Sequence, residues 1–241
     1  MSQALSPFPD VPRITYERNS LSEVVCQLRF PPLLRLQAEP PFQFQERVRE
    51  RFPIYEDTGS QLDLPPQLSR LLGNAGKQQV HKFLSEDGMW AVSVEANFFA
   101  ITCSDYLSWE QFGDNLFSSL NAFIDEYHPS FFNRIGLRYQ NIIDREWIGQ
   151  DASWADFINP SLVGPIRDLE SDLLGARSAL HIQLGEGGDA VQLQHGLVEL
   201  EARNDRCYLL DFDYYTELKT EPKEAENVIN RLHGYSGPAF Q

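Results

Sequence analysis

Alternating apolar and polar residues predict the strands in the first half of the chain. Residues 22–30 place Val24, Cys26, Leu28 and Phe30 on one side and Glu23, Val25, Gln27 and Arg29 on the other. Residues 80–84 and 90–105 predict a hairpin around the turn Glu86-Asp87-Gly88, because glycine tolerates a positive φ. Residues 131–143 again alternate and predict a further strand.

Helical spacing of apolar residues separates these strands. A helix is expected from Pro40-Pro41 to Arg51, and a better marked one spans 108–127, where Ser108 is a natural N-cap and His128-Pro129 ends the pattern. The resulting order β-α-β-β-α-β is typical of a ferredoxin-like lobe, which we expect over residues 21–144 after an N-terminal arm at 1–20.

The second half of the chain has a different pattern of predicted elements. Residues 145–178 predict a linker with short helices, and residues 179–241 predict antiparallel strands followed by a C-terminal helix that ends at Gly234 as its C-cap. The expected strands are 179–184, about 190–203, and 207–218. The predicted class is therefore α+β, a ferredoxin-like lobe beside a smaller antiparallel lobe, with one extended sheet shared by both as a variant.

The composition of the chain narrows the range of functions that it can have. The chain has 241 residues, and 20 Lys and Arg against 35 Asp and Glu give a formal net charge of −15. This balance argues against direct binding of nucleic acid, whose affinity comes from cations that neutralise phosphates. The three cysteines are widely spaced, which fits reduced thiols. No apolar run is long enough to cross a bilayer, and residues 1–12 do not resemble a secretory signal. We therefore expect a cytoplasmic location.

Four carboxylates form the strongest chemical pattern. Glu199 and Glu201 alternate with apolar residues, as do Asp211 and Asp213 on the next predicted strand. If the two strands pair, the four side chains are expected on one face. Three interpretations of such a face are open: an ordinary solvated sheet surface, an anionic surface for a basic protein partner, or a site for Mg²⁺ or Mn²⁺. Apart from such an ion, the sequence indicates no cofactor.

Three arginines form a complementary pattern. Arg134 and Arg138 share a face of one strand, and Arg29 lies on the polar face of the first strand, its expected neighbour. Guanidinium groups bind phosphate or carboxylate through paired hydrogen bonds, so an anion site is one interpretation. The other is pairing with Glu23 and with the acidic face of the second half.

Motifs for catalysis do not stand out. The five histidines fall singly, with neither an H-E-x-x-H pattern nor a G-x-S-x-G nucleophile turn, and the three cysteines lie in apolar strand segments. The run G-E-G-G-D at 185–189 resembles a phosphate loop but lies between strands, which predicts a hairpin turn. A non-enzymatic function is the stronger expectation.

The segment F-N-R-I-G-L-R-Y-Q-N-I-I at 132–143 resembles the signature of a sporadically distributed bacterial family of roughly this size. A first strand like L-S-E-V-V-C-Q-L-R-F, a D-x-D strand and a helix ending in Leu232-His233 extend the resemblance over most of the chain. Members continue beyond the Leu-His helix. The resemblance implies a place in defence or toxin–antitoxin-like gene clusters and supplies no catalytic residues.

Three functions follow as hypotheses. The first is a non-enzymatic protein of a defence or antitoxin-like system that binds a basic protein partner. The second is a metal-dependent enzyme acting on nucleotides or nucleic acid, in which the four carboxylates would hold the ion and the arginines would hold phosphate. The third is a structural subunit that forms a homo-oligomer.

Overall fold

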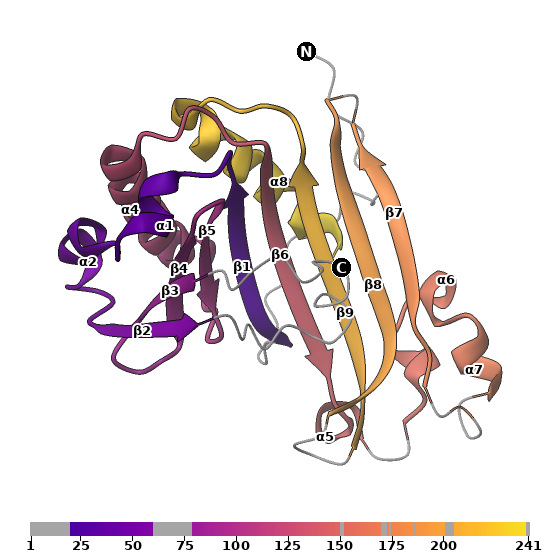
Figure 1. Cartoon of the computed structure of the whole chain (residues 1–241). Helices are drawn as coiled ribbons and strands as arrows, with labels where there is room; N and C mark the ends of the chain where they lie inside the picture. The colour runs from indigo at the N-terminus through magenta and orange to yellow at the C-terminus, as the bar shows by residue number, and fades with distance from the viewer. Residues whose placement is uncertain are drawn as a thin grey trace.

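The computed structural model describes residues 20–59, 79–149, 152–169, 173, 175–185, 187–200 and 205–239. Within them the chain forms one antiparallel sheet of nine strands (Figure 1). The strands are β1 (Leu21–Arg29), β2 (Ile54–Gly59), β3 (Gln79–Leu84), β4 (Trp90–Glu95), β5 (Phe98–Cys103), β6 (Arg134–Ile143), β7 (Ser178–Leu184), β8 (Asp189–Leu200) and β9 (Asp205–Thr216). Apart from Ser20, the expected arm at 1–20 lies outside the described residues.

The strand order is β2-β3-β4-β5-β1-β6-β9-β8-β7. The two halves of the chain meet where β6 pairs with β9, in a register that runs from Ile135 opposite Thr216 to Ile143 opposite Tyr208. The α+β class is therefore confirmed, and of the two arrangements expected for the second half, the single extended sheet is the one observed. The three strands expected after residue 178 are present as β7, β8 and β9.

The predicted strand at 90–105 was wrong in one respect, because it is two strands, β4 and β5. They pair with each other from Trp90 opposite Cys103 to Glu95 opposite Phe98. The reversal takes place at Ala96-Asn97, a turn too short to interrupt an apolar run visibly in the sequence. With β2 added at the edge, β2 to β5 form a four-stranded meander between the first helices and α4.

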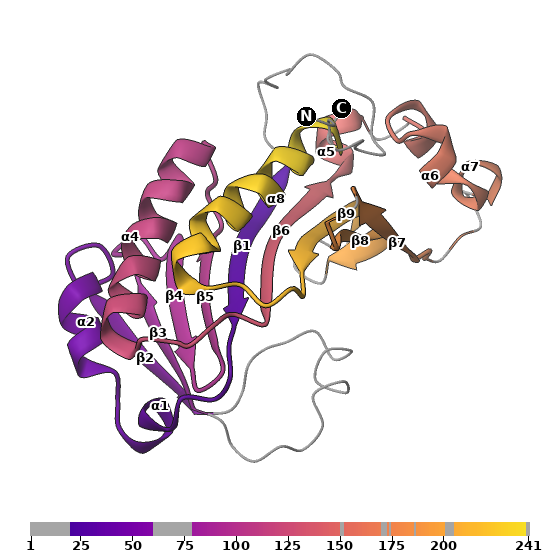
Figure 2. The ribbon, with the colours of Figure 1, turned by 90° about the horizontal axis from the view of Figure 1, so that it is seen from above.

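The longer helices lie along one face of the sheet (Figure 2). They are α2 (Phe42–Val48), α4 (Trp109–Tyr127) and α8 (Ala225–Ala239); the shorter ones are α1 (Leu34–Ala38), α5 (Arg145–Ile148), η1 (Trp154–Asp156), α6 (Pro160–Val163), α7 (Pro165–Leu169) and η2 (Pro222–Glu224). The predicted cap of α4 is confirmed, since the Ser108 hydroxyl accepts a hydrogen bond from the Gln111 N–H. His128 closes α4 with a φ of 46°, followed by Pro129.

The prediction that the last helix ends at Gly234 was wrong, because α8 continues to Ala239. A glycine inside a helix costs only about 1 kcal/mol, which tertiary contacts can offset. The Arg231 guanidinium donates to both carboxylate oxygens of buried Asp189 at 2.7 and 3.0 Å. One turn further on, the Tyr235 hydroxyl donates to the same carboxylate at 3.3 Å, so α8 is held to the start of β8 on both sides of Gly234.

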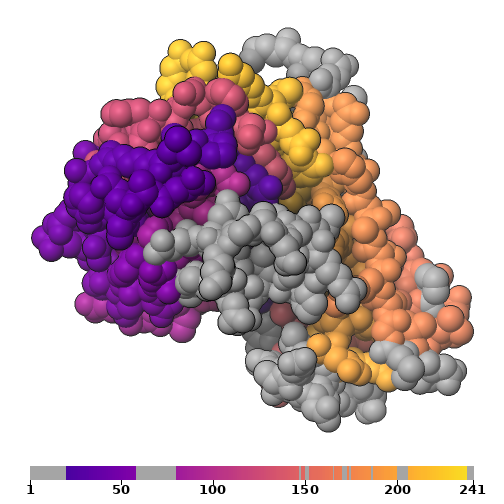
Figure 3. All heavy atoms as spheres, viewed as in Figure 1, coloured from indigo at the N-terminus to yellow at the C-terminus, as the bar shows by residue number. Residues whose placement is uncertain are grey.

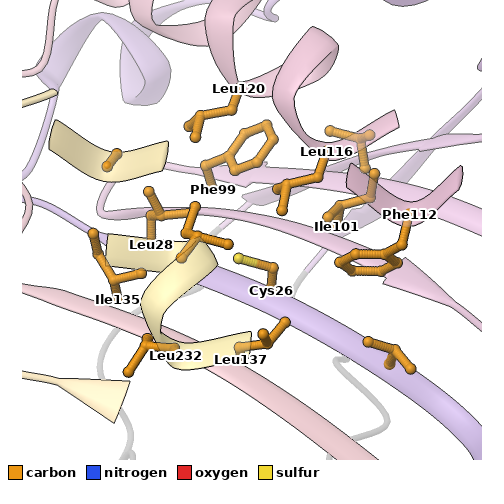
Figure 4. Close-up of a cluster of buried hydrophobic side chains, with 14 of the residues drawn as sticks. Cys26, Leu28, Phe99, Ile101, Phe112, Leu116, Leu120, Ile135, Leu137 and Leu232 are labelled. Atoms are coloured by element: carbon orange, nitrogen blue, oxygen red, sulfur yellow. The ribbon is translucent and has the colours of Figure 1, made fainter. Parts of the chain in front are cut away.

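The main core lies between the sheet and these helices. Side chains of β1, β5 and β6 meet side chains of α4 and α8 there; Figure 4 shows Cys26, Leu28, Phe99, Ile101, Phe112, Leu116, Leu120, Ile135, Leu137 and Leu232. A second, smaller core joins the short helices of the expected linker to β8 and β9, around Trp154 and Tyr208. In the part of the chain that the structure describes, no helix has the length and apolar character needed to cross a membrane.

The sheet has two unlike edges. β2 forms one edge and β7 the other, and the space-filling view shows the orange atoms of β7 and β8 along one outer side of the molecule (Figure 3). None of the described helices packs on the sheet face opposite α4 and α8, which carries polar side chains of several strands together with the buried Ala91 and Ala100.

Tyr214 offers a test of the main core. Its hydroxyl is buried and has no hydrogen-bond partner among the described residues, and burial raises its pKa, so it stays protonated. We expect Tyr214→Phe to leave the free energy of unfolding unchanged or to raise it by up to about 1 kcal/mol, because an unsatisfied buried hydroxyl is destabilising. Tyr208→Phe is the matched control, since the Tyr208 hydroxyl lies 2.9 Å from His195 Nδ1 and its loss should cost about 1 kcal/mol. Urea unfolding followed by circular dichroism compares the two variants, and equal destabilisation by both would contradict this account.

Candidate functional site

The three candidate arginines share one face of the sheet, as expected. Arg29 on β1 lies directly opposite Arg134 on β6, and Arg138 lies four residues further along β6. Their strand neighbours Leu28, Ile135 and Leu137 point into the core, so the guanidinium groups project from the opposite face. We call this surface, with Arg29, Arg134, Arg138, Asp211, Asp213 and Tyr215, the ion-pair face.

Arg138 and Asp211 form the tightest ion pair on the ion-pair face. Arg138 Nε donates to Asp211 Oδ1 at 2.7 Å, and Arg138 Nη2 donates to Asp211 Oδ2 at 2.6 Å. The hydrogen bonds to Asp211 raise the pKa of Arg138. Asp211 is only 6% exposed, so its charge depends on this paired, planar contact for compensation.

Arg134 reaches the second carboxylate by lying across a glycine. Its Nη2 donates to Asp213 Oδ2 at 2.7 Å, and its Cζ lies 4.8 Å from the centre of the Tyr215 ring. A Cβ at Gly136 would overlap the Arg134 Nη1 and would lie 3.1 Å from Cζ and 3.2 Å from Asp213 Oδ1. The absence of a side chain at Gly136 therefore makes room for the guanidinium group.

The network continues toward both edges of the sheet. On one side the Tyr215 hydroxyl lies 2.6 Å from His181 Nε2, which links β9 to β7. On the other side Arg29 Nε donates to Gln27 Oε1 at 3.1 Å. Burial, and next the like charge of Arg134, lower the pKa of Arg29, while burial raises the pKa of the Glu95 carboxyl on β4. Unlike Arg134 and Arg138, Arg29 forms no ion pair with a described carboxylate.

The expectation that four carboxylates share one face was wrong. Asp211 lies opposite Gln194 on β8, whereas Glu199 lies opposite Arg206, five positions further along β8. An odd separation in an unbroken strand places Glu199 on the other face from Asp211. The side chains of β8 that point into the core are those of Val191, Leu193, His195 and Leu197. The expected register had instead placed Val198 and Leu200 in the core. Glu201 lies outside the described residues.

The expected metal ligands are accordingly not assembled. Asp211 and Asp213 point to the same face, but each is already bonded to an arginine. Among the residues that the structure describes, no group of three or more His, Cys, Asp and Glu side chains is placed to hold a metal ion. Binding of Mg²⁺ or Mn²⁺ at Asp211 and Asp213 stays a prediction. The expected pairing of the arginines with the acidic second half, in contrast, is confirmed for Arg134 and Arg138.

The histidines and cysteines have structural settings. Four histidine rings lie within hydrogen-bond distance of a tyrosine hydroxyl: His81 with Tyr55 at 2.8 Å, His181 with Tyr215 at 2.6 Å, His195 with Tyr208 at 2.9 Å and His233 with Tyr139 at 2.8 Å. His233 also stacks on Trp109, with ring centres 3.9 Å apart. All three cysteines are buried, and burial raises the pKa of Cys103 to about 11 and that of Cys26 further, which disfavours reactive thiolates.

A second surface, which the sequence did not suggest, combines acidic and exposed apolar residues. The β3–β4 turn lies against the connection from β5 to α4, because Ser104 N–H donates to the Met89 carbonyl at 2.9 Å. Glu86, Asp87 and Asp105 are exposed there, and none of them forms an ion pair with a described residue. Met89 is 43% exposed and Leu107 71% exposed. We call these five residues the acidic tip.

Hydrogen bonds order the turn of the acidic tip. Asp87 Oδ1 accepts from the Ser85 hydroxyl at 2.6 Å and from the Met89 N–H at 2.9 Å, and Gly88 N–H donates to the Ser85 carbonyl at 3.0 Å. The bond from Ser85, followed by that from Met89, lowers the pKa of Asp87. The Asp87 carboxylate therefore stays ionised at lower pH than an ordinary aspartate, and the tip keeps its negative charge.

Comparison with known proteins adds no family. No protein-family model matches the chain, and no curated protein is significantly similar to it in sequence.

The ion pair at Asp211 can be tested by removing its cation. We expect Arg138→Ala to lower the free energy of unfolding by about 2–3 kcal/mol at neutral pH, because a nearly buried carboxylate loses its partner. Arg49→Ala is the control, since Arg49 pairs with Glu46 in solvent and should contribute little. Urea unfolding at neutral pH measures the loss in both variants, and similar losses would refute the assignment.

The space that Gly136 leaves for the Arg134 guanidinium group can be tested by substitution. We expect Gly136→Ala to lower stability by roughly 1–2 kcal/mol, because the new Cβ displaces Arg134 from Asp213 and Tyr215. In an Arg134→Ala background the same change should be neutral or stabilising, since alanine suits a strand better than glycine does. Unfolding of the four proteins in this double-mutant cycle gives the coupling energy, and additive effects would mean that Gly136 serves another purpose.

Proposed function

We propose that this chain is a non-enzymatic binding protein and that a basic protein partner docks on the acidic tip. The observation that carries the proposal is that the exposed residues Met89 and Leu107 lie in the same two connections as three exposed carboxylates, none of which forms an ion pair with a described residue. The sequence resemblance supports a partner from a defence or toxin–antitoxin-like system.

Charge compensation decides between the two surfaces. On the ion-pair face Asp211 and Asp213 are matched by Arg138 and Arg134, so they offer little net field to a partner. At the acidic tip the carboxylates are exposed, and no cation of the described part of the chain pairs with them. Uncompensated charge of one sign speeds the approach of an oppositely charged protein and selects against acidic ones.

The apolar residues provide what charge alone does not. A stable protein interface generally has an apolar centre that excludes water, surrounded by polar residues that set specificity. Met89 and Leu107 can supply the centre, and methionine adapts its shape to a partner more easily than branched side chains do. Glu86, Asp87 and Asp105 supply the polar surround.

We also propose a ferredoxin-like core within the sheet. Its elements would be β1, α2, β4, β5, α4 and β6, whose strands lie side by side in the order β6-β1-β5-β4. In this interpretation β2 and β3 extend the core on one side, and β9, β8 and β7 extend it on the other. The acidic tip then adjoins this core at the turn that leads into its second strand, β4, and at the connection from its third strand, β5, to its second helix, α4.

A charge-reversed tip tests the proposed function. Glu86→Lys/Asp105→Lys changes the net charge from −15 to −11, because each reversal adds two charges. A Glu50→Lys/Glu226→Lys variant has the same net charge with the tip intact, which makes it the matched control. A basic protein that the unaltered chain captures is first purified. It should then bind the tip variant at least about 10-fold more weakly than it binds the unaltered chain, and it should bind the control as tightly as the unaltered chain.

Ionic strength gives an independent measurement on the same proteins. Binding of the basic partner should weaken as salt increases, because the attraction between exposed charges is screened. Equal binding by the tip variant and the control, or binding insensitive to salt, would exclude the acidic tip as the docking surface.

A further inference from the structure

The outer edge of β7 pairs with no described strand, and it lacks the features that normally keep a sheet edge from pairing. Its seven residues, S-A-L-H-I-Q-L, include no proline and no Lys, Arg, Asp or Glu, and all of them from Ser178 to His181 are exposed. β2, at the opposite edge, carries Glu56 and Asp57 within six residues. Charges on an edge strand oppose the addition of a like strand, so only the β2 edge is protected in this way.

Two rows of apolar side chains cross the sheet to β7, and no further described strand covers their ends there. Leu180 lies opposite Leu193, which lies opposite Phe212; these two partners are buried, but Leu180 is 41% exposed. Ile182, opposite Val191 in the next row, is half-buried. A further strand beside β7 would continue both rows and cover Leu180.

We propose that β7 pairs antiparallel with β7 of a second copy of this chain, joining two nine-stranded sheets across a two-fold axis. An antiparallel pair of identical strands is self-complementary, which is what an isologous dimer requires. The occupant is a second copy because the edge is electrically neutral. Nearby charges on the ion-pair face are matched internally, as in Arg138 with Asp211 and Arg134 with Asp213, so two like edges meet without local repulsion.

This dimer is independent of the partner surface proposed above. The acidic tip belongs to the β3–β4 turn and the β5–α4 connection, whereas β7 ends the other side of the sheet. Salt distinguishes the two associations. Two copies that each carry −15 repel at long range, so salt should strengthen the dimer while it weakens binding of a basic protein.

Sedimentation velocity of the full chain over a range of concentrations tests the dimer. We expect a monomer–dimer equilibrium in the unaltered chain and a dimer weakened on the order of 10-fold or more in Leu180→Lys, because two lysines would be brought together at the edge. Ile54→Lys on β2 is the matched control, since Ile54 is 42% exposed, and it should leave the dimer unchanged. A chain that is monomeric at all concentrations, or a dimer indifferent to Leu180→Lys, overturns the proposal.

Cross-linking keeps the proposal testable if circular dichroism shows that Leu180→Lys does not fold. The three native cysteines are buried, so a single added cysteine dominates the reaction with a flexible bismaleimide. Gln183→Cys on β7 should give a covalent dimer, and Glu56→Cys on β2 should give none. Cross-linking through β2 alone, or through neither position, overturns the β7 dimer.

Discussion

The pairing of β6 with β9 is the contact on which the rest of the architecture depends. It joins strands more than sixty residues apart and converts two groups of strands into one sheet. The same register sets Arg138 and Arg134 beside Asp211 and Asp213, so the hydrogen bonds of the ladder and the ion pairs above it stabilise one alignment. A slip of β9 by one residue would turn Asp211 and Asp213 into the core and away from Arg138 and Arg134, which the cost of burying unpaired charge forbids.

This alignment also determines which surfaces remain open to other molecules. Charges on the ion-pair face are largely satisfied within the chain, and Gly136 and Tyr215 shape the place of Arg134 there. The carboxylates of the acidic tip, where two connections meet, form no ion pair with a described residue. The outer edges of β2 and β7 pair with no described strand, and of the two only β2 carries carboxylates. The proposed partner binding and the proposed self-association therefore use different parts of the sheet.

Much of the local structure could be predicted because its causes lie close together in the chain. The Ser108 cap and the His128-Pro129 end of α4 need only neighbouring residues. Predictions failed where a distant contact overrides a local preference. Gly234 resembles a helix end, but Arg231 and Tyr235 bond to Asp189, more than forty residues away, and carry α8 past it. The face of Glu199 was misjudged because apolar residues at both 197 and 198 allow either side of β8 to point inward.

Alternation, spacing and caps were therefore enough to define the class of the fold, the helix α4, most strands, and the shared face of Arg29, Arg134 and Arg138, since a strand's period of two is a property of the backbone itself. Only the folded chain decided that Asp211 and Asp213 are neutralised, that Glu199 turns away from them, that four histidines meet tyrosines, and that β7 ends the sheet. These outcomes depend on which strands become neighbours, and that choice is made by the burial of the whole core rather than by any short segment.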